Sequence, residues 1–242
     1  IKDDWDLSSL KNESSKKENF NELFENTKLS ENVCASEREN RAFKILKENK
    51  GKISLTTMAE IMRDVGEDSE NYEPDKAELK QNLVCMHAKP HPDAFWHATG
   101  AMITDSNEDG IIVWMTGSAA NDLSIFKPLF FNIPLPNQLN ILPRGVYDNK
   151  SYWWKHEKLH RRAIINYKDL KPEIRNTFDE IERKFFVESQ NLRKASNREK
   201  IEFSQYCWDE AESLTEKLIE KINKRNFPAK SGPFIDMWNN FN

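Results

Sequence analysis

The segment AMITDSNEDGIIVWMT, residues 101–116, has the pattern of a β-hairpin. Asn107–Gly110 supplies turn chemistry, because an Asp-Gly pair favours a tight turn between antiparallel strands. Residues 111–116 form a nearly continuous apolar run, which is typical of a strand buried on both faces. The sequence therefore predicts one strand within 94–105 and a returning strand over 111–116.

Two shorter strands are expected beside this hairpin. Leu83–Met86 is short and apolar, and Ile125–Phe131 can form an extended segment. Pro128 cannot donate to a strand ladder, so this last segment should pair only on one side. Residues 132–149 are rich in Pro and Asn and are predicted to be coil.

Helical patterns flank the predicted sheet on its N-terminal side. Ser36 and Glu39 have the spacing of a capping box, which predicts a helix from there to about Asn49. A second helix is expected over 54–66, with one buried face formed by Leu55, Met58, Ile61 and Met62.

The chain after Ser151 is predicted to be helical. Two long apolar stripes indicate an antiparallel helical hairpin packed on the sheet. Pro172 is expected in the first turn of the first long helix, and a capping box at Ser196–Glu199 begins the second. Phe234–Trp238 is expected to fold back as an apolar tail. The fold class is α+β, with antiparallel strands covered by long helices.

Three regions are expected along the chain: a polar arm over 1–35, a sheet-forming core with its helices over 36–149, and a helical layer with a tail over 150–242. The 242 residues are 38% hydrophobic and 31% charged, which is a globular balance. Ile1 is interpreted as a boundary with further polypeptide upstream.

Composition limits the partners and the compartment. The net charge is −4, and basic residues alternate with acidic ones, so no nucleic-acid partner is expected. No apolar run is long enough to span a bilayer. The three cysteines are widely spaced and no signal segment opens the chain, which favours a reducing, cytoplasmic location. No cofactor is expected.

Four motifs occur in order along the middle of the chain: Cys-Met-His-Ala at 85–88, His-Ala-Thr-Gly-Ala-Met at 97–102, Trp-Met-Thr-Gly-Ser at 114–118 and Ser-Ile-Phe-Lys-Pro at 124–128. Together they resemble the secernins, which belong to the dipeptidase-A-like family of N-terminal-nucleophile hydrolases. The similarity extends over about residues 36–225. This sequence departs from the family at His97-Ala98, where the family has a Thr and its neighbour.

The resemblance implies the C-terminal part of a four-layer αββα fold. It implies a nucleophilic cysteine upstream of Ile1, at the mature N-terminus, whose own α-amino group acts as the base. It further implies hydrolysis of an amide in a small peptide, completed by the N-terminal part of the same protein or by a companion chain. Secernins are also associated with regulated secretion. The alternative is a catalytically inactive protein of the same fold that binds partners.

Family analogy places four residues at the substrate pocket: His87, Thr99, Thr116 and Ser124. The other interpretation of the hydroxyl groups is that they bond to the main chain or to each other. Cys85 would share a strand face with His87, and a thiol beside an imidazole can be activated. We expect Cys85 to be a buried strand residue instead, because an internal cysteine lacks the free amino group of an N-terminal nucleophile.

His156-Glu157-Lys158-Leu159-His160 matches the His-Glu-x-x-His pattern of zinc peptidases. On a helix, the two histidines would lie on one face with Glu157 as general base. The positive flanking residues disfavour a dication, and Lys158 stands where zinc peptidases usually have an apolar residue. A zinc peptidase is therefore kept as a second alternative, and no metal is expected.

Overall fold

The computed structural model describes residues 23–77, 83–91 and 95–240. Most of the polar arm expected over 1–35 thus lies outside the described residues. Three strands occur among the described residues: β1 (Met102–Asn107), β2 (Gly110–Met115) and β3 (Lys127–Phe130). The helices are α2 (Thr27–Asn32), α3 (Ala35–Glu48), α4 (Leu55–Met62), α5 (Tyr152–Ile164), α6 (Tyr167–Asn191), α7 (Asn197–Asn223) and α8 (Pro233–Asn239), with short 3₁₀ turns η1 (Asn121–Leu123) and η2 (Asn137–Asn140).

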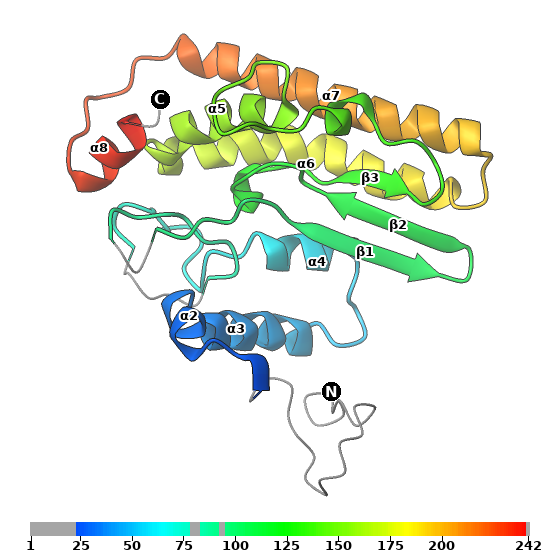
Figure 1. Ribbon diagram of the computed structural model, residues 1–242, viewed down its shortest axis with the longest axis horizontal. Coiled ribbons are helices and arrows are strands. Elements are labelled where there is room, and N and C mark those ends of the chain that lie inside the picture. The colour runs from blue at the N-terminus through cyan, green and yellow to red at the C-terminus, as the bar shows by residue number, and fades with distance from the viewer. Residues whose placement is uncertain (1–22, 78–82, 92–94, 241–242) are drawn as a thin grey trace, which may run out of the picture.

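The strands form one antiparallel sheet in the order β1-β2-β3, which confirms the α+β class. Asn107 pairs with Gly110 across the hairpin turn, as the sequence predicts. Pro128 lies in β3, at the edge of the described sheet, where a residue without an N–H is tolerated. Figure 1 shows α6 and α7 running beside each other next to β3, with α4 and α3 on the side of β1.

Two strand predictions were wrong. Residues 83–86 form no strand, because the N–H groups of Val84 and Cys85 both donate to the carbonyl oxygen of Asp64, at 3.0 and 2.8 Å. The strand predicted from residue 94 begins only at Met102. Before that point, Ala98 makes one main-chain hydrogen bond to each of two loops. Its N–H donates to the carbonyl oxygen of Met86, and its carbonyl oxygen accepts from the N–H of Ala120.

The two faces of the sheet differ. Ile103, Trp114 and Phe130 are at most 7% exposed, and the ring of Trp114 meets Phe186 of α6 edge-on at 4.6 Å. Residues that alternate with these point to the opposite face. On that face Met102 is 56% exposed, and Val113, Met115 and Leu129 are partly exposed. One face is therefore covered by the helical layer, and the other, called here the open face, is apolar near Met102 and Met115, polar at Thr104 and Ser106, and covered at Lys127.

Two helix starts differ from the sequence prediction. α3 begins at Ala35, directly after Cys34 in a left-handed conformation (φ 50°), so Ser36 lies within the helix and forms no capping box. α6 begins at Tyr167 and contains Pro172 in its interior, since burial of Tyr167 and Leu170 outweighs the hydrogen bond that the proline lacks.

The remaining helical predictions are confirmed. Ser196 and Glu199 form the capping box that begins α7. α6 and α7 contact each other and both contact β3. α8 folds back onto the core through Phe234, Ile235 and Trp238, which are buried. None of the helices in the described ranges is both long and apolar enough to cross a membrane.

A buried ion pair fixes the chain between β2 and β3. Glu182 of α6 accepts hydrogen bonds from Arg63, at 2.8 and 2.5 Å, and from the N–H of Phe126, at 2.7 Å. Arg63 also donates to the carbonyl oxygen of Ser124 at 3.0 Å. These bonds tie the segment 116–127, called here the connecting loop, to both α4 and α6.

Candidate functional site

The connecting loop presents a buried carboxylate. Asp122 lies in η1, which follows Ala120 in a left-handed conformation (φ 55°). Its Oδ1 accepts from the thiol of Cys85 at 3.2 Å, and its Oδ2 lies 3.0 Å from Nε2 of His87 and also accepts from the hydroxyl of Tyr167. All four side chains are buried. We call these residues the Asp122 cluster.

The electrostatics of the Asp122 cluster disfavour a reactive thiol. Burial acts to raise the pKa of Asp122, but the effects of His87, Lys171 and Tyr167 are larger together and bring the pKa below its ordinary value. Burial, followed by the charge of Asp122, raises the pKa of the Cys85 thiol well above its usual value. Cys85 is therefore a neutral hydrogen-bond donor at neutral pH, and a thiol in this state is a poor nucleophile.

Three imidazole rings meet beside the Asp122 cluster. His87 comes from the segment 83–91, His97 from the chain preceding β1, and His160 from α5. One nitrogen from each lies within 4.8 Å of the others. We call this group the histidine trio. Burial lowers the pKa of His97 well below its usual value, and the neighbouring His160 and His87 lower it further. His97 is therefore neutral at neutral pH, and a neutral imidazole nitrogen can be a metal ligand or a hydrogen-bond partner.

The two histidines of the His-Glu-x-x-His motif have different surroundings. Nε2 of His156 lies 3.0 Å from the carbonyl oxygen of Leu123, to which it donates. Glu157 accepts from His160 at 3.0 Å and from Arg161 at 2.8 Å. Among the described residues, the groups that could hold a metal include His160 but not His156.

The histidine trio was missed in the sequence because its members come from three distant segments. The motif in α5 identified only one of them. The departure from the family pattern at His97 and the assignment of His87 to the substrate pocket were the other available signals.

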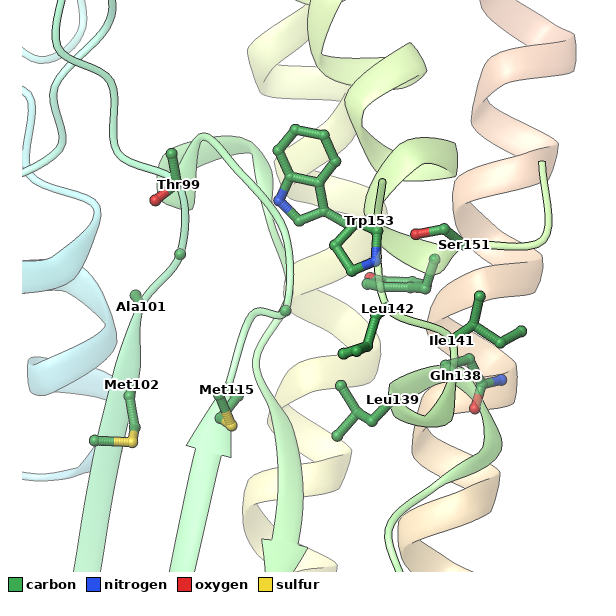
Figure 2. A pocket seen from close by; sticks show the side chains of 14 residues that line it. Thr99, Ala101, Met102, Met115, Gln138, Leu139, Ile141, Leu142, Ser151 and Trp153 are labelled. Atoms are coloured by element: carbon green, nitrogen blue, oxygen red, sulfur yellow. The ribbon is translucent and has the colours of Figure 1, made fainter. Parts of the chain in front are cut away.

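An apolar pocket of about 380 Å³ lies at the end of the sheet and does not include the trio. Figure 2 shows Met102 and Met115 at one side of this pocket and Leu139 and Leu142 at the other, with Trp153 nearby. This volume is within the range of small-molecule sites, and such sites are mostly apolar with a few polar groups. The pocket can hold the apolar portion of a small ligand.

The structure distributes the four predicted substrate-pocket residues over different places. Thr99 lines the apolar pocket. Thr116 is fully buried, and its hydroxyl accepts from the N–H of Ala101 at 2.9 Å. Ser124 is also fully buried, with Oγ 2.8 Å from two main-chain carbonyl oxygens. His87 belongs to the Asp122 cluster and to the trio. The pocket and the buried hydroxyl groups thus do not form one site.

A buried lysine was not singled out from the sequence. Lys127 is fully buried, and its Nζ donates to the carbonyl oxygens of Thr116 and Ile125, at 2.5 and 2.9 Å, and to the hydroxyl of Tyr152 at 3.1 Å. The ammonium also lies 4.5 Å from the ring centre of Trp208. Burial lowers the pKa of Lys127 well below its usual value. The lysine holds the two ends of the connecting loop together.

The sequence matches no protein-family model, and neither a curated protein nor a solved structure is significantly similar to it.

Proposed function

We propose that this chain forms one wall of the substrate cleft of a secernin-like amide hydrolase, and that the nucleophilic cysteine lies outside the chain. The observation that carries the proposal is the open face of the sheet. In an αββα fold each sheet has a helical layer on one face and a second sheet on the other. Helices cover the face of Ile103 and Trp114 in the described sheet, whereas the open face is covered only in part: Tyr152 and Trp208 contact Lys127 at the β3 edge, and Met102 at the β1 edge is 56% exposed.

The distribution of reactive groups supports a binding role for this chain. The Cys85 thiol is buried with a raised pKa, and the hydroxyl groups of Thr116 and Ser124 are buried and bonded to the main chain. No group among these candidates is exposed to a substrate. The chemistry would therefore come from the N-terminal part of the same protein or from a companion chain.

The apolar pocket indicates what this wall would bind. Met102, Met115 and Leu142 offer apolar surface, and Thr99 offers a hydroxyl at the rim. This combination suits a small peptide with an apolar side chain. The three cysteines, Cys34, Cys85 and Cys207, are free and buried, which fits the cytoplasmic location that forms part of the proposal.

A second candidate is an inactive protein of the same fold that binds a partner through the open face. The exposure of apolar residues favours it: Leu142 is 80% exposed, and such surface often marks an interaction site.

The test uses the full-length protein. Its mature N-terminus is sequenced by mass spectrometry, and hydrolysis of apolar dipeptides is measured before and after treatment with iodoacetamide. We expect an N-terminal cysteine, and loss of hydrolysis when it is alkylated. An active protein that is insensitive to alkylation and has no N-terminal cysteine would contradict the proposal, and a folded protein without hydrolysis of any dipeptide would favour the interaction protein.

A pair of leucine variants tests the pocket in the same assay. Leu142→Glu places a charge in the pocket and should raise KM for apolar dipeptides at least about tenfold, because the buried charge is desolvated when the ligand binds. Leu135→Glu is the control, since Leu135 is 53% exposed and does not line the pocket. Equal KM values for the two variants would remove the pocket from the proposal.

A further inference from the structure

We infer that His87, His97 and His160 form a binding site for a divalent transition-metal ion, of which zinc is the best fit. The inference goes beyond the proposed function and does not depend on it. It rests on the position of the three imidazole nitrogens and on the groups bonded to the other side of the rings.

Each ring of the trio has one buried nitrogen without a hydrogen-bond partner among the described residues. These atoms are Nδ1 of His87, Nε2 of His97 and Nε2 of His160. A buried polar atom without a partner is unfavourable, and the three rings that carry these atoms have centroids between 4.6 and 6.3 Å apart, so that one partner could serve all three. A metal ion would accept a lone pair from Nδ1 of His87 and from Nε2 of His160, and from Nε2 of His97 once the proton of that ring has moved to Nδ1.

In two of the rings, a carboxylate bonds to the nitrogen that is not the proposed metal ligand. An ionised carboxylate only accepts hydrogen bonds, so Nε2–H of His87 donates to Asp122 and Nδ1–H of His160 donates to Glu157, each at 3.0 Å. The proton on the outer nitrogen leaves a lone pair on the inner one. This carboxylate–histidine arrangement is the usual support of metal-binding histidines, and it fixes both tautomer and ring orientation.

The same carboxylates supply charge. Three neutral imidazoles bring none, whereas Asp122 and Glu157 each place one negative charge behind a ligand. Arg161 and Lys171 lie next to these carboxylates and offset part of that charge. The formal charges of these four groups cancel, but the groups bonded to the rings are the two carboxylates, so the charge nearest the rings is negative and suits a cation.

His97 differs from the other two ligands. Its Nδ1 accepts a long hydrogen bond of 3.3 Å from the N–H of Ala88, so the proton of the neutral ring stands on Nε2 without metal. Metal binding through Nε2 moves that proton to Nδ1 and breaks the bond to Ala88. His97 is thus the ligand whose contribution the experiment must establish separately.

The spacing and the ligand type indicate zinc. Three nitrogens at the usual zinc distance of about 2.0–2.1 Å stand about 3.4 Å apart in a tetrahedron. The nitrogens of the trio lie within 4.8 Å of each other, which small side-chain rotations can close. Neutral imidazoles suit zinc, copper and nickel, and are not ligands that magnesium or calcium prefers. A water molecule would take the fourth position.

The second group that could hold a metal, formed by Cys85, His87 and Asp122, is a weaker candidate. Its members already bond to one another through Asp122, and the Cys85 thiol is protonated. A metal there would have to displace these hydrogen bonds, whereas the trio has three nitrogens without partners.

The experiment measures zinc binding to the chelator-treated protein by competition with a chromophoric chelator. Cobalt(II) binding is followed by its d–d absorption, which reports a tetrahedral site. We expect one zinc per chain with a Kd tighter than about 1 µM, and a rise in Tm with zinc, because zinc binds the native state. Neither readout depends on hydrolysis, so the outcome is independent of the proposed function.

Three single variants locate the site. His97→Ala and His160→Ala should each weaken zinc binding at least about 100-fold, more than the 10- to 100-fold expected for loss of a supporting carboxylate. His156→Gln is the control on the same helix as His160, and it should retain the wild-type Kd. Circular dichroism verifies that each variant is folded.

A further variant addresses misfolding. Asp122→Asn keeps the size of the side chain and leaves the three histidines unchanged, but it removes the negative charge bonded to His87. It should weaken zinc binding about 10- to 100-fold. Wild-type protein that is folded but binds neither zinc nor cobalt nor copper below about 1 µM would overturn the inference. Binding that survives in folded His97→Ala and His160→Ala but is lost in His156→Gln would also overturn it, in favour of a different site. Cobalt or copper binding without zinc binding would change the metal and not the ligands.

Discussion

The connecting loop and the open face of the sheet are built in opposite ways. In the loop, polar side chains such as Asp122 and Ser124 are fully buried and bonded to defined partners. On the open face, apolar side chains such as Met102 are exposed. The difference indicates that the loop contributes more to the stability of the native structure than the exposed part of the open face does. Stability measurements should therefore respond strongly to changes in the loop and weakly to changes on the open face.

Loss of the loop carboxylate should have the largest effect. Asp122→Ala removes the acceptor of Cys85, His87 and Tyr167 and leaves three buried polar groups without that partner. We expect the free energy of unfolding in urea to fall by about 3–5 kcal/mol. Asp75→Ala, at an exposed position, is the control and should change it little. Similar values for the two variants would show that the loop does not depend on its carboxylate.

The contribution of the connecting loop to stability should also depend on pH, because His156 donates a hydrogen bond to Leu123 in this loop. Burial lowers its pKa to about 4 from an ordinary value of 6.5. The unfolded chain therefore binds a proton as pH falls below 6.5, whereas the folded chain does so only near 4, and the folded state loses stability in this window. We expect a loss of about 3 kcal/mol from this group. His156→Gln should flatten this part of the stability curve, and an unchanged slope would contradict the assignment.

The buried lysine should have an intermediate effect. Lys127→Met removes the donor of two main-chain carbonyl groups and of Tyr152, but it also removes a charge that is costly to bury. The net loss in the free energy of unfolding should be about 1–3 kcal/mol. Lys184→Met on the surface of α6 is the control. A more stable Lys127→Met variant would show that the burial cost exceeds the value of the three hydrogen bonds.

The sequence predicted the parts of the fold that depend on neighbouring residues. The turn at Asn107–Gly110 and the capping box at Ser196–Glu199 are set by local backbone chemistry, and both are found. The predictions failed where distant contacts decide. Leu83–Met86 has the composition of a strand, but the N–H groups of Val84 and Cys85 bond to Asp64 at the end of α4, which composition cannot show.

The candidate site was less predictable for the same reason. The histidine trio needs His87, His97 and His160 from three segments. Its partner Asp122 comes from a fourth segment, and Glu157 comes from the same helix as His160. Within the motif in α5, His160 and Glu157 form a hydrogen bond that helical spacing allows. The motif also predicts His156 as the second metal ligand, but His156 bonds to Leu123, and His160 groups with His87 and His97 instead.

The smallest effect is expected on the open face, and two adjacent residues of β1 test it directly. Met102 points to the open face and is 56% exposed, whereas Ile103 points to the helical layer and is 4% exposed. Ile103→Ala should lower the free energy of unfolding by about 2–4 kcal/mol, because it leaves a cavity in the core. Met102→Ala should lower it by less than about 0.5 kcal/mol, as is usual for surface positions. A large loss for Met102→Ala would mean that the open face is covered in the native protein by polypeptide of the same molecule, and binding of a separate partner there would then have to displace it.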